Sequence, residues 1–198
     1  PPEPEPEVIY PYTYPLTGSG TYEQLEDRPI LVLVENHRDA RPQSGLIHAD
    51  IVYEILAEGE ITRFAAVFHS EQPEVIGPIR SLRPYYAEIG AGWDAMIVHA
   101  GYSPAAKKMV QERRLDHFDE IYGDGAYYWR SKERYAPHNL YSSVELIRKG
   151  QTNKGMRTEW KQPAAIPFAD KDVEIQGEQA DYVRVEYLLG YHVEYKYD

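Results

Sequence analysis

The distribution of apolar residues predicts a sheet whose inner strands are covered on both faces. Residues 30–34 form an uninterrupted apolar run, ILVLV, and residues 95–100 form a second, AMIVHA. Runs of this kind are typical of strands buried on both sides, whereas strict alternation indicates one solvated face. Two further apolar stretches flank the turn Glu58-Gly59-Glu60 and predict a β-hairpin. We therefore expect strands near 30–36, 51–57, 61–69 and 95–100.

Three helix starts can be recognised from their first residues. Pro84 and Pro104 suit the first turn of a helix, where a missing N–H costs nothing, and Ser103 can cap the second of these helices. Ser142, with Glu145 three residues later, has the pattern of a capping box. We expect helices near 84–90, 104–113 and 142–149. The fold class predicted is α/β (or α+β), a mixed sheet with flanking helices followed by an additional β-rich segment.

The chain divides by composition into three parts. Residues 1–20 are rich in proline and glutamate, which favours an extended tether. Residues 151–171 are loop-like, and short stretches near 173–175, 182–188 and 191–197 then indicate strands of a sheet with one solvated face. We expect a tether at 1–20, an α/β core domain at 21–155, and the start of an incomplete β-rich C-terminal domain at 156–198.

Charge and composition exclude several classes of protein. The 198 residues carry a formal net charge of −11, which opposes nonspecific binding of nucleic acid or of anionic lipid. No apolar run approaches the roughly 20 residues that a membrane-spanning helix needs. The chain has no cysteine, so disulfides, thiolate metal sites and a cysteine nucleophile are absent. The 18 tyrosines, against four phenylalanines, predict half-exposed strands or surfaces that bind a partner.

The stretch from Gly77 to Pro104 holds the highest density of groups that could bind a ligand. Arg80, Ser81 and Arg83 precede the helix expected at 84–90. Two guanidiniums, a hydroxyl and free backbone N–H groups form a plausible anion site. The alternative is that each arginine pairs with a surface carboxylate.

The other candidate side chains lie at strand ends and helix starts. His99 ends a buried strand and could serve as a base, or could be a core histidine with satisfied hydrogen bonds. Ser103 could cap a helix, bind an anion or act as a nucleophile, although its surroundings lack the G-x-S-x-G pattern of hydrolases. His138 and Asn139 follow a proline ahead of a helix. Arg63 could pair across the hairpin with a glutamate, or could join the site.

Several short motifs follow one another along the chain: NH (36–37), ARPQSGL (40–46), ADIVYE (49–54), EG (58–59), ITRF (61–64), GP (77–78), RS (80–81), RPYY (83–86), HAG (99–101), SP (103–104) and APHNLY (136–141). Together and in this order they resemble those of the YerB-like lipoprotein family, DUF3048. The resemblance covers residues 29–150, and the tail from about 167 is similar to the start of that family's smaller β-rich domain. It implies a lipid-anchored protein on the outer face of a Gram-positive-type membrane. The sequence contains no signal peptide or lipid-bearing cysteine, so the anchor is inferred, and the resemblance implies no defined activity.

Three functions remain open. The first, which we favour, is a binding module for an anionic small molecule or cell-wall fragment. The second is an envelope hydrolase or transferase with a histidine base and arginines that stabilise developing charge. The third is a protein-interaction scaffold that uses the tyrosine-rich surfaces. The catalytic candidates are His99, His138 and Ser103; the ligand-binding candidates are Arg63, Arg80, Ser81, Arg83, His99, Ser103, His138 and Asn139.

Partners and cofactors follow from the same observations. We expect an anionic ligand or a protein partner, no nucleic acid, and membrane contact only through the inferred anchor. A metal site built from His37, His99 and His138 is conceivable, but no short His spacing supports it. We therefore expect neither a metal nor another cofactor.

Overall fold

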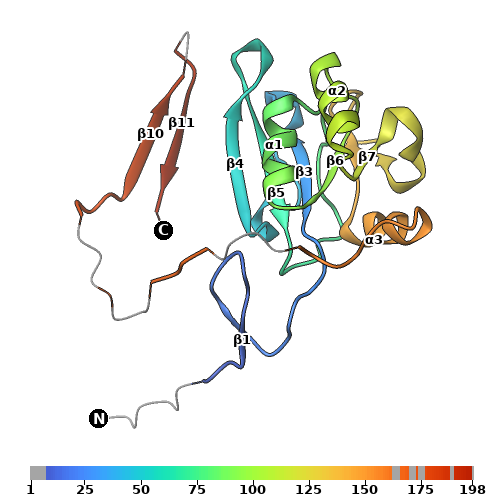
Figure 1. Ribbon diagram of the computed structural model, residues 1–198. Helices are drawn as coiled ribbons and strands as arrows, with labels where there is room; N and C mark the ends of the chain where they lie inside the picture. Colours follow the sequence, from blue (N-terminus) through green and yellow to red (C-terminus); the bar gives the residue numbers. More distant parts are fainter. Residues whose placement is uncertain (1–7, 162–165, 170–172, 174–176, 188–189, 198) are drawn as a thin grey trace.

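A five-stranded mixed sheet forms the centre of the protein (Figure 1). The computed structural model describes residues 8–161, 166–169, 173, 177–187 and 190–197. The strand order is β4-β5-β3-β6-β7, in which β3 pairs antiparallel with β5 and parallel with β6. The strands are β3 (Ile30–Glu35), β4 (Ile51–Leu56), β5 (Thr62–Phe68), β6 (Met96–His99) and β7 (His117–Asp119).

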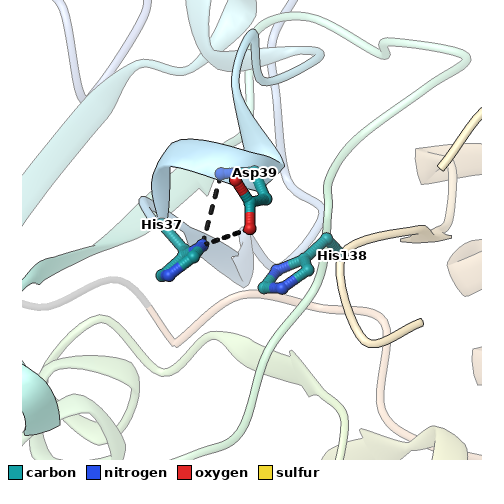
Figure 2. A group of neighbouring side chains, drawn as sticks. All are labelled: His37, Asp39 and His138. Carbon is teal, nitrogen blue, oxygen red and sulfur yellow. Dashed lines mark hydrogen bonds and ion pairs between the residues drawn. The ribbon is translucent and has the colours of Figure 1, made fainter. Parts of the chain in front are cut away.

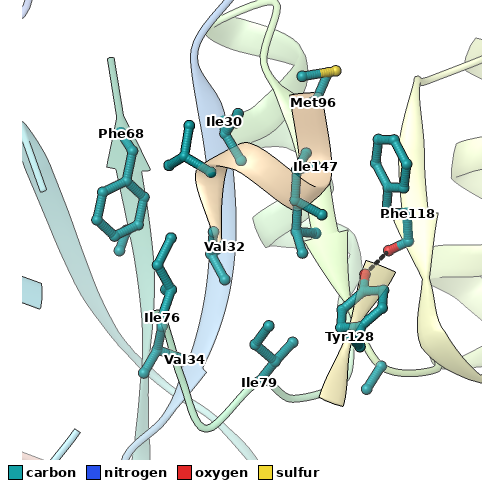
Figure 3. Close-up of a cluster of buried hydrophobic side chains, with 14 of the residues drawn as sticks. Ile30, Val32, Val34, Phe68, Ile76, Ile79, Met96, Phe118, Tyr128 and Ile147 are labelled. Atoms are coloured by element: carbon teal, nitrogen blue, oxygen red, sulfur yellow. Dashed lines mark hydrogen bonds between the residues drawn. The ribbon is translucent and has the colours of Figure 1, made fainter. Parts of the chain in front are cut away.

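The two faces of β3 face two separate cores. Ile30, Val32 and Val34 pack with residues of α3 (Val144–Asn153) in one cluster (Figure 3). Leu31 and Leu33 pack with residues of α1 (Pro84–Gly92) and α2 (Pro104–Arg113) in the other. Successive residues of a strand point to opposite faces, so an uninterrupted apolar run is what a strand between two helical layers requires.

Shorter elements surround this sheet. Within the segment expected to be a tether, Leu16 is buried and belongs to the same apolar cluster as Trp160, which follows α3. Three two-stranded sheets are formed by β1 (Tyr12–Thr13) with β2 (Gly20–Thr21), β8 (Trp129–Arg130) with β9 (Leu140–Tyr141), and β10 (Tyr182–Glu186) with β11 (His192–Lys196). The short helical turns are η1 (Arg38–Ala40), η2 (Leu46–His48), η3 (Glu58–Glu60), η4 (Glu120–Asp124) and η5 (Gly125–Tyr127). No helix among the described residues is both long and apolar enough to cross a bilayer.

The fold class and the expected central elements are confirmed, with one wrong capping assignment. Ser143, not Ser142, caps α3 and accepts from the N–H of Leu146 at 3.1 Å. The Ser142 hydroxyl instead donates to the carbonyl of Tyr127 at 2.8 Å. Both serines precede the helix, and only the backbone path decides which hydroxyl faces the free N–H groups. The strand β7 was not expected, because its apolar content is a single phenylalanine.

The division into tether, core and C-terminal domain stays a prediction. The strand expected near 173–175 lies largely outside the described residues, while β10 and β11 fall where alternation predicted them.

Two neighbouring histidines, the buried His99 at the end of β6 and the half-buried His117 at the start of β7, are in contact. The side chain of His99 is fully buried, and its Nδ1 donates to the carbonyl of Gly101 at 2.9 Å. Its Nε2 is then left to accept from Nδ1 of His117 at 3.0 Å. Burial lowers the pKa of His99 to about 4, although the nearby Asp119 carboxylate opposes this, and burial also lowers the pKa of His117. Both rings are therefore neutral in the folded protein near pH 7.

The His99 environment predicts a loss of stability in mild acid. An unfolded histidine takes up a proton near pH 6.5, whereas folded His99 does so only near pH 4. The unfolded chain thus binds more protons between these values, and the free energy of unfolding should fall as the pH decreases through this window. The slope from one such group reaches about 1.4 kcal/mol per pH unit. Urea denaturation of His99→Gln between pH 4.5 and 7 should show a shallower slope than the wild type. The exposed His192→Gln is the control, and an equal slope in both variants would contradict the assignment.

Replacing either of two helical glycines with alanine should change the free energy of unfolding in opposite directions. A Cβ at Gly150 in α3 would lie 2.5 Å from Cε1 of Phe118, whereas a Cβ at Gly92 in α1 would meet no heavy atom within 4 Å. Gly150→Ala should therefore lower the free energy of unfolding by about 1–3 kcal/mol, despite the better helix propensity of alanine. Gly92→Ala should raise it by up to about 1 kcal/mol. Chemical denaturation of the two variants measures both effects, and equal stabilisation of both would show that α3 does not pack closely on Phe118.

Candidate functional site

The sheet topology gathers polar side chains at one edge. The parallel strands β3 and β6 end there, at Glu35 and His99. The antiparallel strand β5 begins there, and Arg63 lies opposite Glu35 in its register with β3. The turn η3, which connects β4 to β5, lies at the same edge. The carboxyl ends of parallel strands are the usual place for ligands in open α/β sheets.

An irregular segment enters between β3 and β6 at this edge. The two strands pair only from Ile30 to Val32, after which Ile79 forms a bridge with Val34. The N–H of Arg80 donates to the carbonyl of Leu33 at 2.8 Å. The segment from 77 to 83 therefore continues the sheet locally and brings its arginines to the end of β3.

Glu35 is a buried carboxylate that contacts an arginine and a histidine. Its Oε1 lies 3.1 Å from Nε of Arg80, an ion pair that lacks the alignment of a hydrogen bond. Its Oε2 accepts from Nδ1 of His138 at 3.0 Å. A buried carboxylate is costly unless it is paired. These two contacts therefore hold the segments that carry Arg80 and His138 against the end of β3.

Two more arginines share one exposed carboxylate. Glu58, on η3, is bonded by Nε of Arg83 and lies 3.7 Å from Nη2 of Arg63. The side chain of Glu58 is 60% exposed, whereas those of Arg63 and Arg83 are 8% and 19% exposed. The Arg83 hydrogen bond contributes most to holding the pKa of Glu58 below its usual value. Burial lowers the pKa of Arg63, and repulsion from Arg83 and Arg80 adds to this. The three arginines are therefore close enough to affect one another.

The remaining sequence candidates have structural partners. Ser103 caps α2 and accepts from the N–H of Ala106 at 3.2 Å. The carbonyl of Ser81 accepts from Nη1 of Arg63. Asn139 accepts from Arg130 at 3.0 Å and donates to two carbonyls of its own loop. His99 does not reach the surface, so in this conformation its ring is not available to a ligand at the arginines.

Glu54 does not pair with Arg63 across the hairpin. Its carboxylate accepts instead from Asn36 at 3.2 Å, from Thr62 at 2.5 Å and from the hydroxyl of Tyr195 on β11. Of the two glutamates considered as partners of Arg63, it is Glu58 on the turn η3 that forms the ion pair. The β10–β11 hairpin contacts the core at this polar network.

One group of side chains has the composition of a metal site. His37, Asp39 and His138 each offer a ligand atom, and these atoms lie within 4.8 Å of one another (Figure 2). His37 and Asp39 follow β3, while His138 comes from the loop before β9.

Sequence reasoning missed Glu35 and Asp39 at this edge. Glu35 could have been noticed, because it is the first charged residue after a fully apolar strand. No local signal pointed to Asp39, since its proximity to His138 arises from the tertiary fold.

Comparisons with known proteins identify relatives of this chain. The family model described as "Protein of unknown function (DUF3048) N-terminal domain" matches residues 16–157. The "Putative lipoprotein YerB" of Bacillus subtilis (strain 168) is 42% identical over 188 residues, which cover 93% of this chain and 56% of that protein. The chain thus spans about half the length of this relative.

The crystal structure of the YerB protein from Bacillus subtilis has the same fold. It superposes with a TM-score of 0.82 at 41% identity, over 94% of this chain and 63% of the crystallised one. The resemblance drawn from the motifs is confirmed, and the chain belongs to the DUF3048 family, of which it carries the N-terminal domain.

Proposed function

We propose that this protein binds an anionic small molecule or cell-wall fragment at Arg63, Arg80 and Arg83, on the outer face of the cell membrane. The location is supported by its relative, which is named a lipoprotein. The observation that carries the ligand class is Glu58, an exposed carboxylate held by two largely buried arginines. Glu58 occupies the position that a ligand carboxylate or phosphate would take.

The charge balance at the site favours an anion. The three arginines face two carboxylates, Glu35 and Glu58, so this group is net positive in a chain of net charge −11. Glu35 is buried, and its contacts with Arg80 and His138 hold it in place. Glu58 is exposed on a short turn, and exposed ion pairs contribute only about 0–1 kcal/mol. An anion with two oxygens can therefore displace Glu58 at low cost and bind both arginines.

The helix starts nearby support the same ligand class. Arg83 precedes α1, whose N-terminus has no side-chain cap. The N–H of Ser103 donates to the carbonyl of Leu82 at 3.2 Å, so the N-terminus of α2 lies alongside. The positive ends of the two helix dipoles add to the field of the arginines.

Hydrolysis or group transfer remains the second candidate function, because Nδ1 of His138 donates to Glu35 and leaves Nε2 as the nitrogen that a general base would use. The serine that the sequence offered as a nucleophile, Ser103, is instead occupied as the cap of α2. We therefore favour binding over hydrolysis or group transfer.

The displacement of Glu58 is testable by titration with inorganic phosphate and with citrate. Glu58→Gln removes the internal competitor, and we expect isothermal titration calorimetry to show about tenfold tighter binding, or about 1.4 kcal/mol. Arg83→Gln should weaken binding at least tenfold, because one of the two cations is lost.

Glu71→Gln is the matched control. Glu71 is 58% exposed, close to the value for Glu58, and it pairs with His48 rather than with an arginine. The change in net charge is the same, so its effect should be small. Equal affinities of the Glu58→Gln and Glu71→Gln variants, or full binding by Arg83→Gln, would overturn the proposal.

A further inference from the structure

We propose that His37, Asp39 and His138 bind a divalent transition metal ion such as Zn²⁺. Their ligand atoms lie within 4.8 Å of one another (Figure 2). Two imidazole nitrogens and one carboxylate oxygen form a ligand set that suits zinc and leaves a fourth position open. This site does not need an anion at the arginines in order to form.

The end of β3 positions two of the ligands. His37 precedes η1, and its Nδ1 accepts from the N–H of Asp39 at 3.2 Å. The same nitrogen lies 3.6 Å from Oδ2 of Asp39 (Figure 2). The turn therefore directs an imidazole and a carboxylate to the same point, just beyond a strand that is buried along its whole length. A rigid strand end is a suitable base for a metal site.

The third ligand is oriented from behind by Glu35. Because a carboxylate only accepts, the 3.0 Å contact means that Nδ1 of His138 carries the proton and donates it to Glu35. In the neutral ring the lone pair is then on Nε2, which is the atom free to bind a cation. A carboxylate that holds the far nitrogen of a histidine is the usual support of a metal-ligating imidazole. Glu35 is itself held by Arg80, so this support is rigid.

The three side chains are close enough to reach one ion after small rotations. The rings of His37 and His138 are stacked, with centroids 4.8 Å apart and planes at 15°. Zinc–nitrogen bonds of about 2.0–2.1 Å place tetrahedral ligand atoms about 3.3 Å apart. Rotations of three partly exposed side chains can supply the remaining approach, since Asp39 is exposed and the histidines are half-buried. Without an ion, the same contacts would serve only as a turn cap and a ring stack.

Calorimetric titration of the chelator-treated protein with Zn²⁺ distinguishes a metal site from a turn cap and ring stack that bind no ion. We expect one saturable site per chain and a rise in melting temperature with added Zn²⁺. The conservative changes Asp39→Asn and His138→Gln should each weaken binding at least 100-fold. Glu35→Gln, which keeps the shape of the supporting side chain, should weaken it about 10–100-fold.

Two controls keep the result specific. His48→Gln removes another partly exposed histidine that contacts a glutamate, and it should leave Zn²⁺ affinity unchanged. Arg83→Gln should also bind Zn²⁺ normally, which separates this site from the anion site. Circular dichroism verifies that each variant is folded; Asp39 is exposed, so its variant should fold. Absence of saturable binding, or wild-type affinity in folded Asp39→Asn, would overturn the proposal.

Discussion

A single buried carboxylate, Glu35, determines how the loops at the sheet edge are arranged. It ends a strand on which every residue is buried, so its charge has no access to bulk water. Such a charge is costly to bury, and it requires ion-pair or hydrogen-bond partners in place of water. Arg80 and His138 meet this requirement from two loops that are 58 residues apart in the sequence. The same contacts that satisfy Glu35 therefore assemble the candidate site.

The two proposed sites meet at this carboxylate. One oxygen of Glu35 faces Arg80, which belongs to the arginine group, and the other faces His138, which belongs to the candidate metal site.

Burial affects the charge of the arginines and of the histidines differently. Arg63 is nearly buried yet keeps its charge, because a guanidinium has a very high pKa and finds a carboxylate and a carbonyl as partners. His99 is buried and neutral, because its ordinary pKa lies close enough to neutrality for burial to decide its state. The histidine that seemed best placed in the sequence is thus part of the structural core. His37 and His138, by contrast, are only half-buried and can be reached from solvent.

The sequence by itself determined the central elements and the family. Apolar runs, turn signals and capping residues act over a few positions, so the strands 30–36, 51–57, 61–69 and 95–100 and the three helices could be read directly. The DUF3048 family was indicated by the order of the motifs along the chain. The candidate site could be predicted only in part: the sequence placed Arg80 and Arg83 together, because they are neighbours in one segment.

Only the tertiary structure decided which groups meet. The order β4-β5-β3-β6-β7 brings Arg63 beside Glu35, and the entry of segment 77–83 between β3 and β6 follows from that order. The pairing of Glu58 with two arginines, and the approach of His138 to Asp39, join positions that are far apart in the chain. Local patterns carry no information on such distances, because these contacts form when buried strands pack and their charged ends must find partners.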